Sequence, residues 1–277
     1  MKYSIRFYRG CRILDKVDEI IVKYKKADPE LIDFIKEHPQ QKIVADITDL
    51  PEIESSFQIF LDAAAASPRF TVLLIGSLPH RQDYEWFHEN NIPFFFCEYA
   101  DNFDTFQSFV INGASEIRIA GELGFHIRDI AQYCNSKGIK VRVYPNVAQE
   151  AGPFSHDAIE TFFIRPEAVS LYEPYVDIFE FWGDDNSKQD VLYQIYEDRH
   201  WNGTLNELIL SYHGAPVDNL SLLPQFDVVR LGCNKICTLG KCNSCTYAEV
   251  IAKAIEKHGI QIKEKREPIK KNEDNNK

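Results

Sequence analysis

Short apolar runs recur along the chain, and the segments between them have the hydrophobic period of amphipathic helices. The runs are rich in β-branched and aromatic residues, and several are almost continuously apolar, as is typical of parallel strands covered on both faces. The pattern predicts strands at Glu19 to Tyr24, Lys42 to Ile47, Thr71 to Ile75, Phe94 to Glu98, Glu116 to Ala120, Lys140 to Tyr144, Thr161 to Ile164 and Asp177 to Phe181. The opening run, Tyr3 to Tyr8, is also strand-like, and we expect it to pair with the strand that follows it or to close one end of the fold.

Helix signals mark the segments between these strands. Asp28 followed by Pro29 has the pattern of an N-cap and a first-turn proline. Asp49 and Glu52 have the spacing of a capping box, which predicts the start of a second helix. Gly138 lies where a later amphipathic helix should end, and glycine is the residue that most readily adopts the left-handed cap of a helix C-terminus.

The alternation of strands and helices predicts an α/β fold, a (β/α)8 TIM-like barrel. The segment Pro166 to Val176 leaves room for only a short helix in the last unit. An open, doubly wound sheet is the alternative, and in both folds ligands bind at the C-terminal ends of the strands. Beyond the eighth strand the pattern predicts a helix around Val191 to Tyr196, a helical turn over Leu205 to Tyr212 and a strand over Asp227 to Leu231.

The domain organisation follows from the absence of a break in this pattern. We expect a single domain over residues 1–262, which includes a cysteine-rich metal loop at 233–245 and a helix after it. Residues 263–277 are mostly charged and contain almost no apolar side chains, so they lack the means to pack and predict a disordered tail.

Composition narrows the class of partner. The chain has 31 Lys and Arg against 42 Asp and Glu, a formal net charge of -11 in 277 residues, which argues against broad contact with nucleic-acid phosphates. We therefore expect a small-molecule or protein substrate. No apolar run approaches the roughly 20 residues of a membrane-spanning helix, and no hydrophobic stretch follows the basic N-terminus. A cytoplasmic protein is the expectation.

Four of the seven cysteines lie close together, as Cys233, Cys237, Cys242 and Cys245 in a C-x3-C-x4-C-x2-C arrangement. Four thiolates suit a tetrahedral zinc ion or a four-iron four-sulfur cluster, and the spacing leaves both open. It is not the C-x3-C-x2-C run of radical-SAM enzymes. The remaining cysteines, Cys11, Cys97 and Cys134, are isolated, and we expect them to pack as small apolar residues.

Polar residues at the predicted strand ends are the candidate catalytic groups, because that face of a barrel collects them. Arg165 could hold an anionic substrate, and Asn146 and Glu180 could line the same pocket. Further strand-end candidates are Asp46, Asp49, Glu98, Glu122, Glu167, Asp184 and Asp185. His126 follows Glu122 at helical spacing, but Gly124 interrupts that turn and a capping or surface histidine is favoured.

The usual nucleotide and hydrolase motifs are absent from the sequence, namely G-x-G-x-x-G, the P-loop, G-x-S-x-G and H-E-x-x-H. Dinucleotide-dependent hydride transfer, nucleotide hydrolysis and serine hydrolysis therefore lose their usual support.

Two stretches resemble the peptidase U32 family: GASEIRIAGELGFHIRDIAQYCNSKGIKVRVYPNV at 113–147 and FFIRPEAVSLYEPYVDIFEFWG at 162–183. The resemblance implies a TIM-like barrel. It also implies one of the family's activities, either proteolysis, by its original naming, or oxygen-independent hydroxylation by members that hold a four-iron four-sulfur cluster. In those members the cysteine ligands are more widely scattered than here, and no residue motif in this chain supports a peptidase mechanism.

Two hypotheses of different classes follow. In the first, the chain is a U32-like metalloenzyme with an iron–sulfur cluster near the barrel mouth. In the second, a structural zinc ion staples the C-terminal helix to a non-catalytic barrel that acts as a binding or accessory module.

Overall fold

The computed structural model describes residues 2–7, 13–24, 29–50, 52–74, 81–96, 100–124, 126–147, 149–150, 161–182, 186–210, 218–221, 227 and 231. The four clustered cysteines, Cys11, Cys97, Glu98, Asp184, Asp185 and the tail at 263–277 lie outside the described residues.

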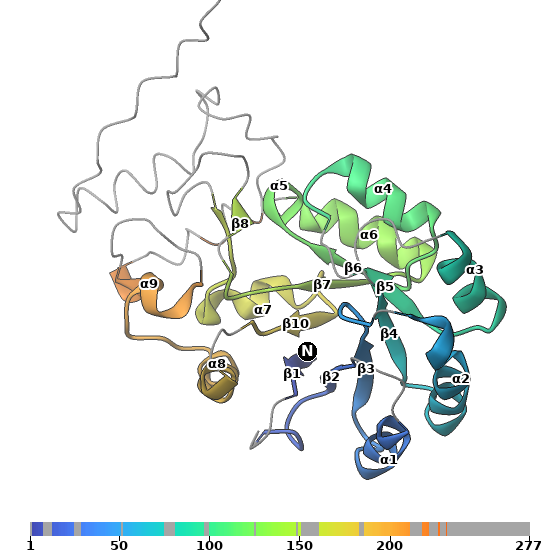
Figure 1. Ribbon diagram of the computed structural model, residues 1–277. Helices are drawn as coiled ribbons and strands as arrows, with labels where there is room; N and C mark the ends of the chain where they lie inside the picture. The colour runs from blue at the N-terminus through green and yellow to red at the C-terminus, as the bar shows by residue number, and fades with distance from the viewer. Residues whose placement is uncertain are drawn as a thin grey trace, which may run out of the picture.

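Eight parallel strands form the centre of the fold (Figure 1). They are β1 (Tyr3–Arg6), β2 (Glu19–Lys23), β3 (Lys42–Asp46), β4 (Thr71–Leu74), β5 (Phe94–Phe96), β6 (Glu116–Ile119), β7 (Lys140–Val143) and β10 (Ile178–Glu180). Their order is β5-β4-β3-β2-β1-β10-β7-β6. The two edges approach each other, because the backbone N–H of Ser115 donates to the carbonyl of Phe94 at 2.8 Å and Ala100 pairs with Ile119. The predicted TIM-like barrel is confirmed as a nearly closed (β/α)8 fold.

One strand of the barrel differs from the prediction. β1 lies between β2 and β10 as a full member of the sheet, so the run at Tyr3 is the first barrel strand. The run expected at Thr161 to Ile164 is not a barrel strand. Its first two residues form β9 (Thr161–Phe162), which pairs antiparallel with β8 (Gln149–Glu150) in a separate two-stranded sheet. β10 pairs directly with β7 and leaves no place between them.

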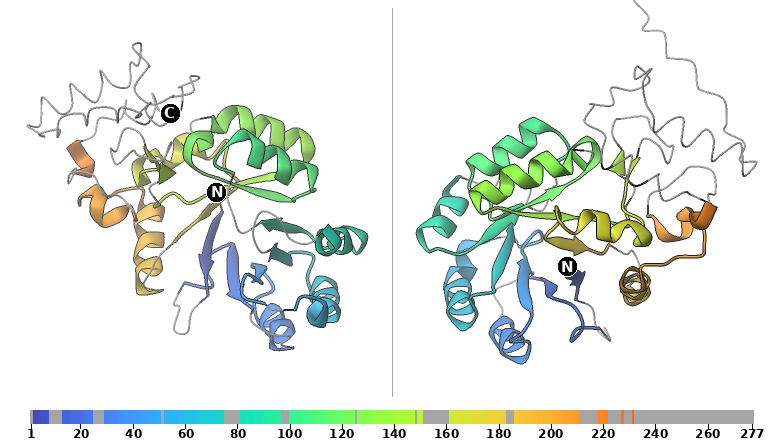
Figure 2. Two further views of the ribbon diagram at one scale, coloured as in Figure 1. Left: turned by 45° about the horizontal axis from the view of Figure 1, so that its top comes forward. Right: turned by 180° about the vertical axis from the view of Figure 1, so that it is seen from behind.

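Helices surround the strands, and the views of Figure 2 show them on the outside of the barrel. The longer ones are α1 (Glu30–Glu37), α2 (Phe57–Ala66), α3 (Arg81–Glu89), α4 (Phe103–Ile111), α6 (Ile127–Lys137) and α8 (Asn186–Asp198). Short turns of helix are α5 (Gly121–Gly124), α7 (Val169–Tyr172), α9 (Leu205–Leu208) and the 3-10 turns Glu54–Ser56, Pro166–Ala168 and Asn219–Ser221. No helix among the described residues is long and apolar enough to cross a lipid bilayer.

Several helix predictions are confirmed. α6 is amphipathic, buries Ile127, Ile130, Ala131 and Cys134, and ends as predicted at Gly138, whose φ of 70° is left-handed. The last crossover is short, as expected, because the 3-10 turn at Pro166 and the four-residue α7 fill it.

The start of the second helix and the last strand were predicted wrongly. The helical backbone begins at Glu54, and neither Asp49 nor Glu52 caps it. Asp49 instead forms an ion pair with Lys23 at 2.6 Å, so its carboxylate has a partner from a neighbouring strand. Asp227 and Leu231, the two described residues of the expected strand at 227–231, have helical backbone.

Two apolar regions hold the barrel together. The larger one fills the space between the outward faces of the strands and the surrounding helices. The smaller one lies among the inward-facing residues, and we call it the apolar wall; it consists of Ile21, Val44, Leu73 and Phe95. These four come from consecutive strands β2 to β5 and line one side of the barrel interior, where Ile21 is the register partner of Val44 and Leu73 that of Phe95.

Candidate functional site

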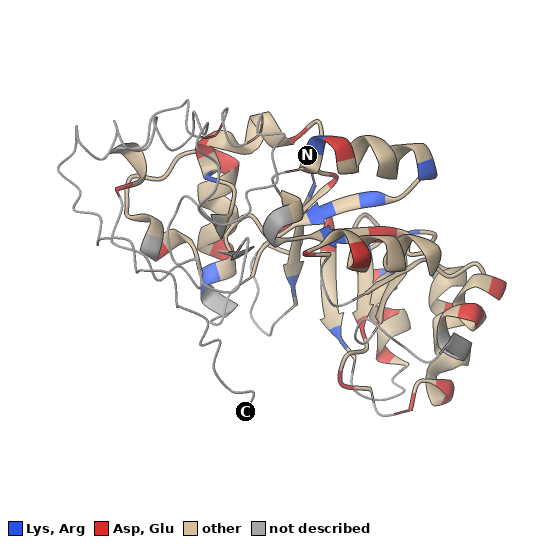
Figure 3. Ribbon diagram, turned by 90° about the horizontal axis from the view of Figure 1, so that it is seen from above, with Lys and Arg blue, Asp and Glu red and all other residues tan. Residues whose placement is uncertain are grey.

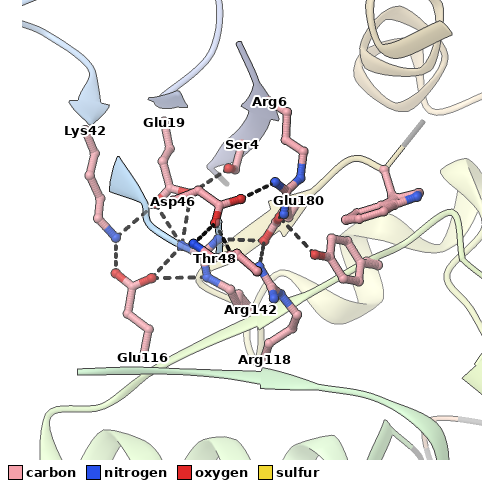
Figure 4. Close-up of polar contacts among 12 residues, drawn as sticks. Ser4, Arg6, Glu19, Lys42, Asp46, Thr48, Glu116, Arg118, Arg142 and Glu180 are labelled. Atoms are coloured by element: carbon pink, nitrogen blue, oxygen red, sulfur yellow. Dashed lines mark hydrogen bonds and ion pairs between the residues drawn. The ribbon is translucent and has the colours of Figure 1, made fainter. Parts of the chain in front are cut away.

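Charged side chains fill the rest of the barrel interior (Figure 4). We call this group the charged cluster; it consists of Arg6, Glu19, Lys42, Asp46, Glu116, Arg118, Arg142 and Glu180. The local sequences explain the placement. β6 is EIRI and β7 is KVRV, so charged and apolar residues alternate, and successive side chains of a strand point to opposite faces. The apolar set packs under the helices, which directs the charged set inward. Figure 3 marks the basic and acidic positions along the ribbon.

Arg142 on β7 connects the cluster and is fully buried. Its guanidinium donates to Glu19 at 2.8 Å, to Glu180 at 2.8 Å and to Glu116 at 2.5 Å. The same guanidinium carbon lies 4.1 Å from the ring centroid of Phe95, so one cation is shared by three carboxylates and the apolar wall. Its pKa is raised well above its usual value because these carboxylates outweigh the effect of burial.

The N-terminal ends of the strands form the floor of the cluster. Lys42 pairs with Glu19 at 2.9 Å and also with Glu116, and the hydroxyl of Ser4 donates to Glu19 at 2.5 Å. Burial alone would raise the pKa of both glutamates. Arg142 and Lys42 outweigh burial and hold the pKa of Glu19 and of Glu116 below the ordinary value, so both are charged.

The C-terminal ends of the strands form the mouth, because Arg6, Asp46 and Glu180 are the last residues of β1, β3 and β10. Arg6 Nη1 lies 2.5 Å from Asp46 Oδ2, and Arg6 Nη2 lies 3.9 Å from Glu180 Oε1. The backbone N–H of Thr48 donates to Asp46 Oδ1 at 3.1 Å, and its hydroxyl donates to the same oxygen. The mouth therefore carries an arginine–carboxylate pair where a barrel normally binds its ligand.

Glu180 lies just beneath that pair and is fully buried. It accepts hydrogen bonds from Arg118 at 2.7 Å, from Arg142 at 2.8 Å and from the hydroxyl of Tyr144 at 3.0 Å. Burial would raise the pKa of Glu180, but the arginines outweigh it and lower the pKa to about 2. A carboxylate that stays ionised in this way is suited to holding Arg118 and Tyr144 in place; a role in catalysis stays a prediction.

The structure places the other two predicted site residues on different partners. Asn146 is buried, and its side-chain amide donates to the carbonyl of Trp182 at 2.6 Å and accepts from the Trp182 N–H at 3.2 Å. This amide joins the segments that follow β7 and β10, close to Glu180. Arg165 is also buried and donates to Asp227 at 2.5 and 3.0 Å and to the carbonyl of Asn219 at 2.9 Å. Arg165 thus fixes segments that follow the barrel.

Glu167, like Arg165, binds segments that follow the barrel. Glu167 accepts hydrogen bonds from the backbone of Trp201 at 2.7 Å and from the side chain of Asn219 at 2.9 Å. His126 stands at the N-terminal boundary of α6. Cys134 is buried as expected, and burial, followed by the charge of Asp177, raises the pKa of its thiol to about 12. Within the described part of the chain, no three His, Cys, Asp or Glu side chains are arranged to hold a metal ion.

Most members of the charged cluster were not among the predicted site residues, Asp46 and Glu180 being the exceptions. The signal that could have identified them is the alternation of charged and apolar residues along β6 and β7. In a strand whose outer face is covered by helices, a charge at every second position has to point into the barrel.

Comparison with known proteins identifies no family for this chain. No protein-family model and no curated protein matches the sequence. Among solved structures, 3-keto-L-gulonate-6-phosphate decarboxylase from Vibrio cholerae is 13% identical with a TM-score of 0.43, over 72% of this chain and 98% of that one. An enolase from Pseudomonas fluorescens is 14% identical with a TM-score of 0.39, over 60% of this chain and 38% of that one. A U32 peptidase is 13% identical with a TM-score of 0.39, over 67% and 94%. The chain thus spans well under half of the enolase's length.

Proposed function

We propose that this chain is a cytoplasmic, U32-like barrel enzyme in which Cys233, Cys237, Cys242 and Cys245 hold a four-iron four-sulfur cluster beside the barrel mouth. The observation that supports it is the buried ion pair between Arg165 and Asp227, at 2.5 Å, which attaches the segment leading to the cysteines to the C-terminal side of the strands.

The position of that ion pair follows from the backbone. Ile164 donates its N–H to the carbonyl of Pro145 at 2.9 Å, and Pro145 comes directly after the C-terminal end of β7. Arg165 is the next residue, and Asp227 is therefore held on the side where the strands end. Cys233 is six positions after Asp227, and an extended chain of that length spans at most about 20 Å. A cysteine loop attached there suits a site beside the mouth.

The donor set is chemically appropriate. Four thiolates are the ordinary ligands of such a cluster, and when bound it would supply one-electron transfer. The chain's own residues would position the substrate next to it. Arg6 and Arg118 would hold negative charge, Tyr144 would offer its hydroxyl, and the amide of Asn146 would keep the segments after β7 and β10 together.

Anaerobic purification tests the proposal. We expect a brown protein with broad absorbance at about 400 nm and about four iron and four sulfide ions per chain. Cys237→Ser and Cys242→Ser should lose most of the iron. Cys134→Ala is the matched control, because Cys134 is a buried thiol within α6, and it should keep its iron. Iron-free preparations after anaerobic reconstitution with iron and sulfide would contradict the proposal.

The second candidate is a zinc-stapled binding or accessory barrel. The observation that favours it is the internal balance of the charged cluster, in which four cationic side chains face four carboxylates and little charge is left for a substrate. It predicts a colourless protein with one tightly bound zinc ion per chain, and Cys→Ser variants that lose C-terminal structure, measured by the rate of limited proteolysis.

A further inference from the structure

We propose that Arg6 binds the anionic group of a small ligand, a carboxylate or a phosphate, at the barrel mouth, and that the ligand takes the place of Asp46 on the guanidinium. The inference deepens the proposed function by naming the substrate class. It depends on the same mouth, but the binding step itself needs no metal.

Accessibility distinguishes Arg6 from the other arginines of the cluster. Its side chain is 27% exposed, whereas those of Arg118 and Arg142 are 2% and 0% exposed. Arg6 is the last residue of β1, so its exposed portion is at the end of the barrel where ligands enter. A solute that reaches the charged cluster from this side therefore meets Arg6 before the other two.

The guanidinium of Arg6 also has unused capacity. It contacts Asp46 through Nη1 and interacts with the hydroxyl of Tyr144, its Nη2 is beyond hydrogen-bond distance of Glu180 at 3.9 Å, and its buried Nε has no partner among the described residues. An arginine presents five N–H donors in a planar fork that matches carboxylate and phosphate groups. Asp46 and Tyr144 hold the fork in place, and its donors are incompletely used.

Asp46 is arranged so that it can release Arg6. Only Oδ2 faces Arg6, while Oδ1 accepts from both the backbone N–H and the hydroxyl of Thr48 (Figure 4). When an anion replaces Oδ2, Asp46 keeps the two hydrogen bonds on its other oxygen. Because the cluster is already charge-balanced, an incoming anion exchanges with a carboxylate that is present, and the negative charge of Asp46 opposes its entry.

Trp182 forms a wall of the proposed site. The Arg6 guanidinium carbon lies 4.8 Å from its ring centroid, and Tyr144 packs against the indole edge-on at 5.6 Å. The side chain is partly exposed at 37%, and its backbone is fixed by Asn146. The fluorescence of this indole should therefore respond when an anion binds the guanidinium in contact with it.

A single-tryptophan protein provides the test. The chain has three tryptophans, and the double variant Trp86→Phe, Trp201→Phe leaves Trp182 as the reporter. Inorganic phosphate and succinate are titrated separately at constant ionic strength, with sodium chloride as the reference salt. We expect a saturable change with at least one of the two anions, and their relative affinities identify the preferred group.

Substitutions in this background separate binding from structure. Arg6→Gln should weaken binding about tenfold or more, since a charge-assisted hydrogen bond is lost, and Arg6→Lys should recover part of it. Asp46→Asn should tighten binding several-fold because the competing charge is removed. Arg199→Gln is the matched control, since it breaks a surface ion pair with Glu173 and should leave the titration unchanged.

Separate outcomes test the binding of the anion to Arg6 and its exchange with Asp46. An absent or non-saturable response in the Asp46→Asn protein, or equal affinity in Arg6→Gln, overturns the anion site. Weaker binding in Asp46→Asn overturns the exchange, and this variant keeps the test valid if Arg6→Gln does not fold. Iron is measured on the same samples: an iron-free protein that binds the anion rejects the proposed cluster alone, and an iron-loaded protein that does not bind it rejects this inference alone.

Discussion

The two sides of the barrel interior are filled by different kinds of side chain, apolar on one side and charged on the other. On β2 to β5 the apolar wall fills its space with four buried side chains that need no partners. On β6, β7 and β10 the space is filled by Glu116, Arg118, Arg142 and Glu180, and each is held by ionic contacts with the others or with Glu19 and Lys42. Smaller side chains on the apolar side lower the stability of the fold in small steps. On the charged side, the loss of one partner disrupts the whole group, because it leaves a buried charge without compensation.

The two sides meet at Phe95. Three cations lie near its ring: Arg142 at 4.1 Å, Arg118 at 5.6 Å and Lys42 at 5.7 Å from the centroid. The ring belongs to the apolar wall by packing and to the charged cluster by its attraction for cations.

Arg142→Met gives the largest expected effect. It removes the cation shared by Glu19, Glu116 and Glu180, and breaking a buried ion pair typically costs about 3–5 kcal/mol in the free energy of unfolding. Urea denaturation measures the loss. Arg128→Met, an arginine of α6 outside the cluster, is the control and should change stability by about 0.5 kcal/mol or less. A loss below about 1 kcal/mol for Arg142→Met would show that the charged side tolerates substitution as well as the apolar side does.

Acid should destabilise the charged side next. The pKa of Glu180 is lowered from its ordinary 4.5 to about 2, and those of Glu19 and Glu116 are also lowered. A lowered pKa in the folded state contributes stability that is complete above pH 4.5 and is lost as pH falls from 4.5 toward 2. Denaturation series between pH 7 and pH 3 should show this fall. Glu180→Gln should have a shallower slope in that window, and an unchanged slope would contradict the assignment.

Phe95→Leu should have a moderate effect. It removes volume from the apolar wall and an aromatic ring from three cations, and we expect a loss of about 1–2 kcal/mol in the free energy of unfolding. Phe103→Leu is the control, because Phe103 is 45% exposed on α4 and should change stability by about 0.5 kcal/mol or less. Equal losses in the two variants would indicate that the ring of Phe95 is not shared between the sides.

Thr48→Val should have the smallest effect, about 0.5–1 kcal/mol, since it removes one hydrogen bond to Asp46 at the mouth and retains the shape of the side chain. Thermal unfolding measures it, with Thr105→Val on α4 as a surface control. A loss of several kcal/mol would mean that the mouth depends on Asp46 far more than its contacts indicate.

The sequence pattern predicted the barrel but not the identity of every strand. Both Tyr3 to Tyr8 and Thr161 to Ile164 have the composition of a strand, and composition does not specify a partner. The two runs differ in their strand pairing, because β1 pairs with β2 and β10 in the barrel, whereas β9 pairs with β8 outside it.

The candidate site was only partly predictable for a related reason. Glu180 was found because it ends a strand, and Arg142 was missed because it lies in the middle of one. Arg165 also follows a strand-like run, but the side chain it binds, Asp227, is 62 residues further along the chain. No local pattern contains a contact of that kind.

The neighbouring positions of β1 and β10 have a consequence for how the chain is made. Ser4 is aligned with Glu180, so β1 acquires its second neighbour only when synthesis has continued from Ser4 as far as Glu180. Until then Arg6 and Arg142 lack Glu180, and the barrel has an open seam with unpaired backbone groups on both edges. Nascent chains that stop before Ile178 should therefore be the form most in need of a chaperone.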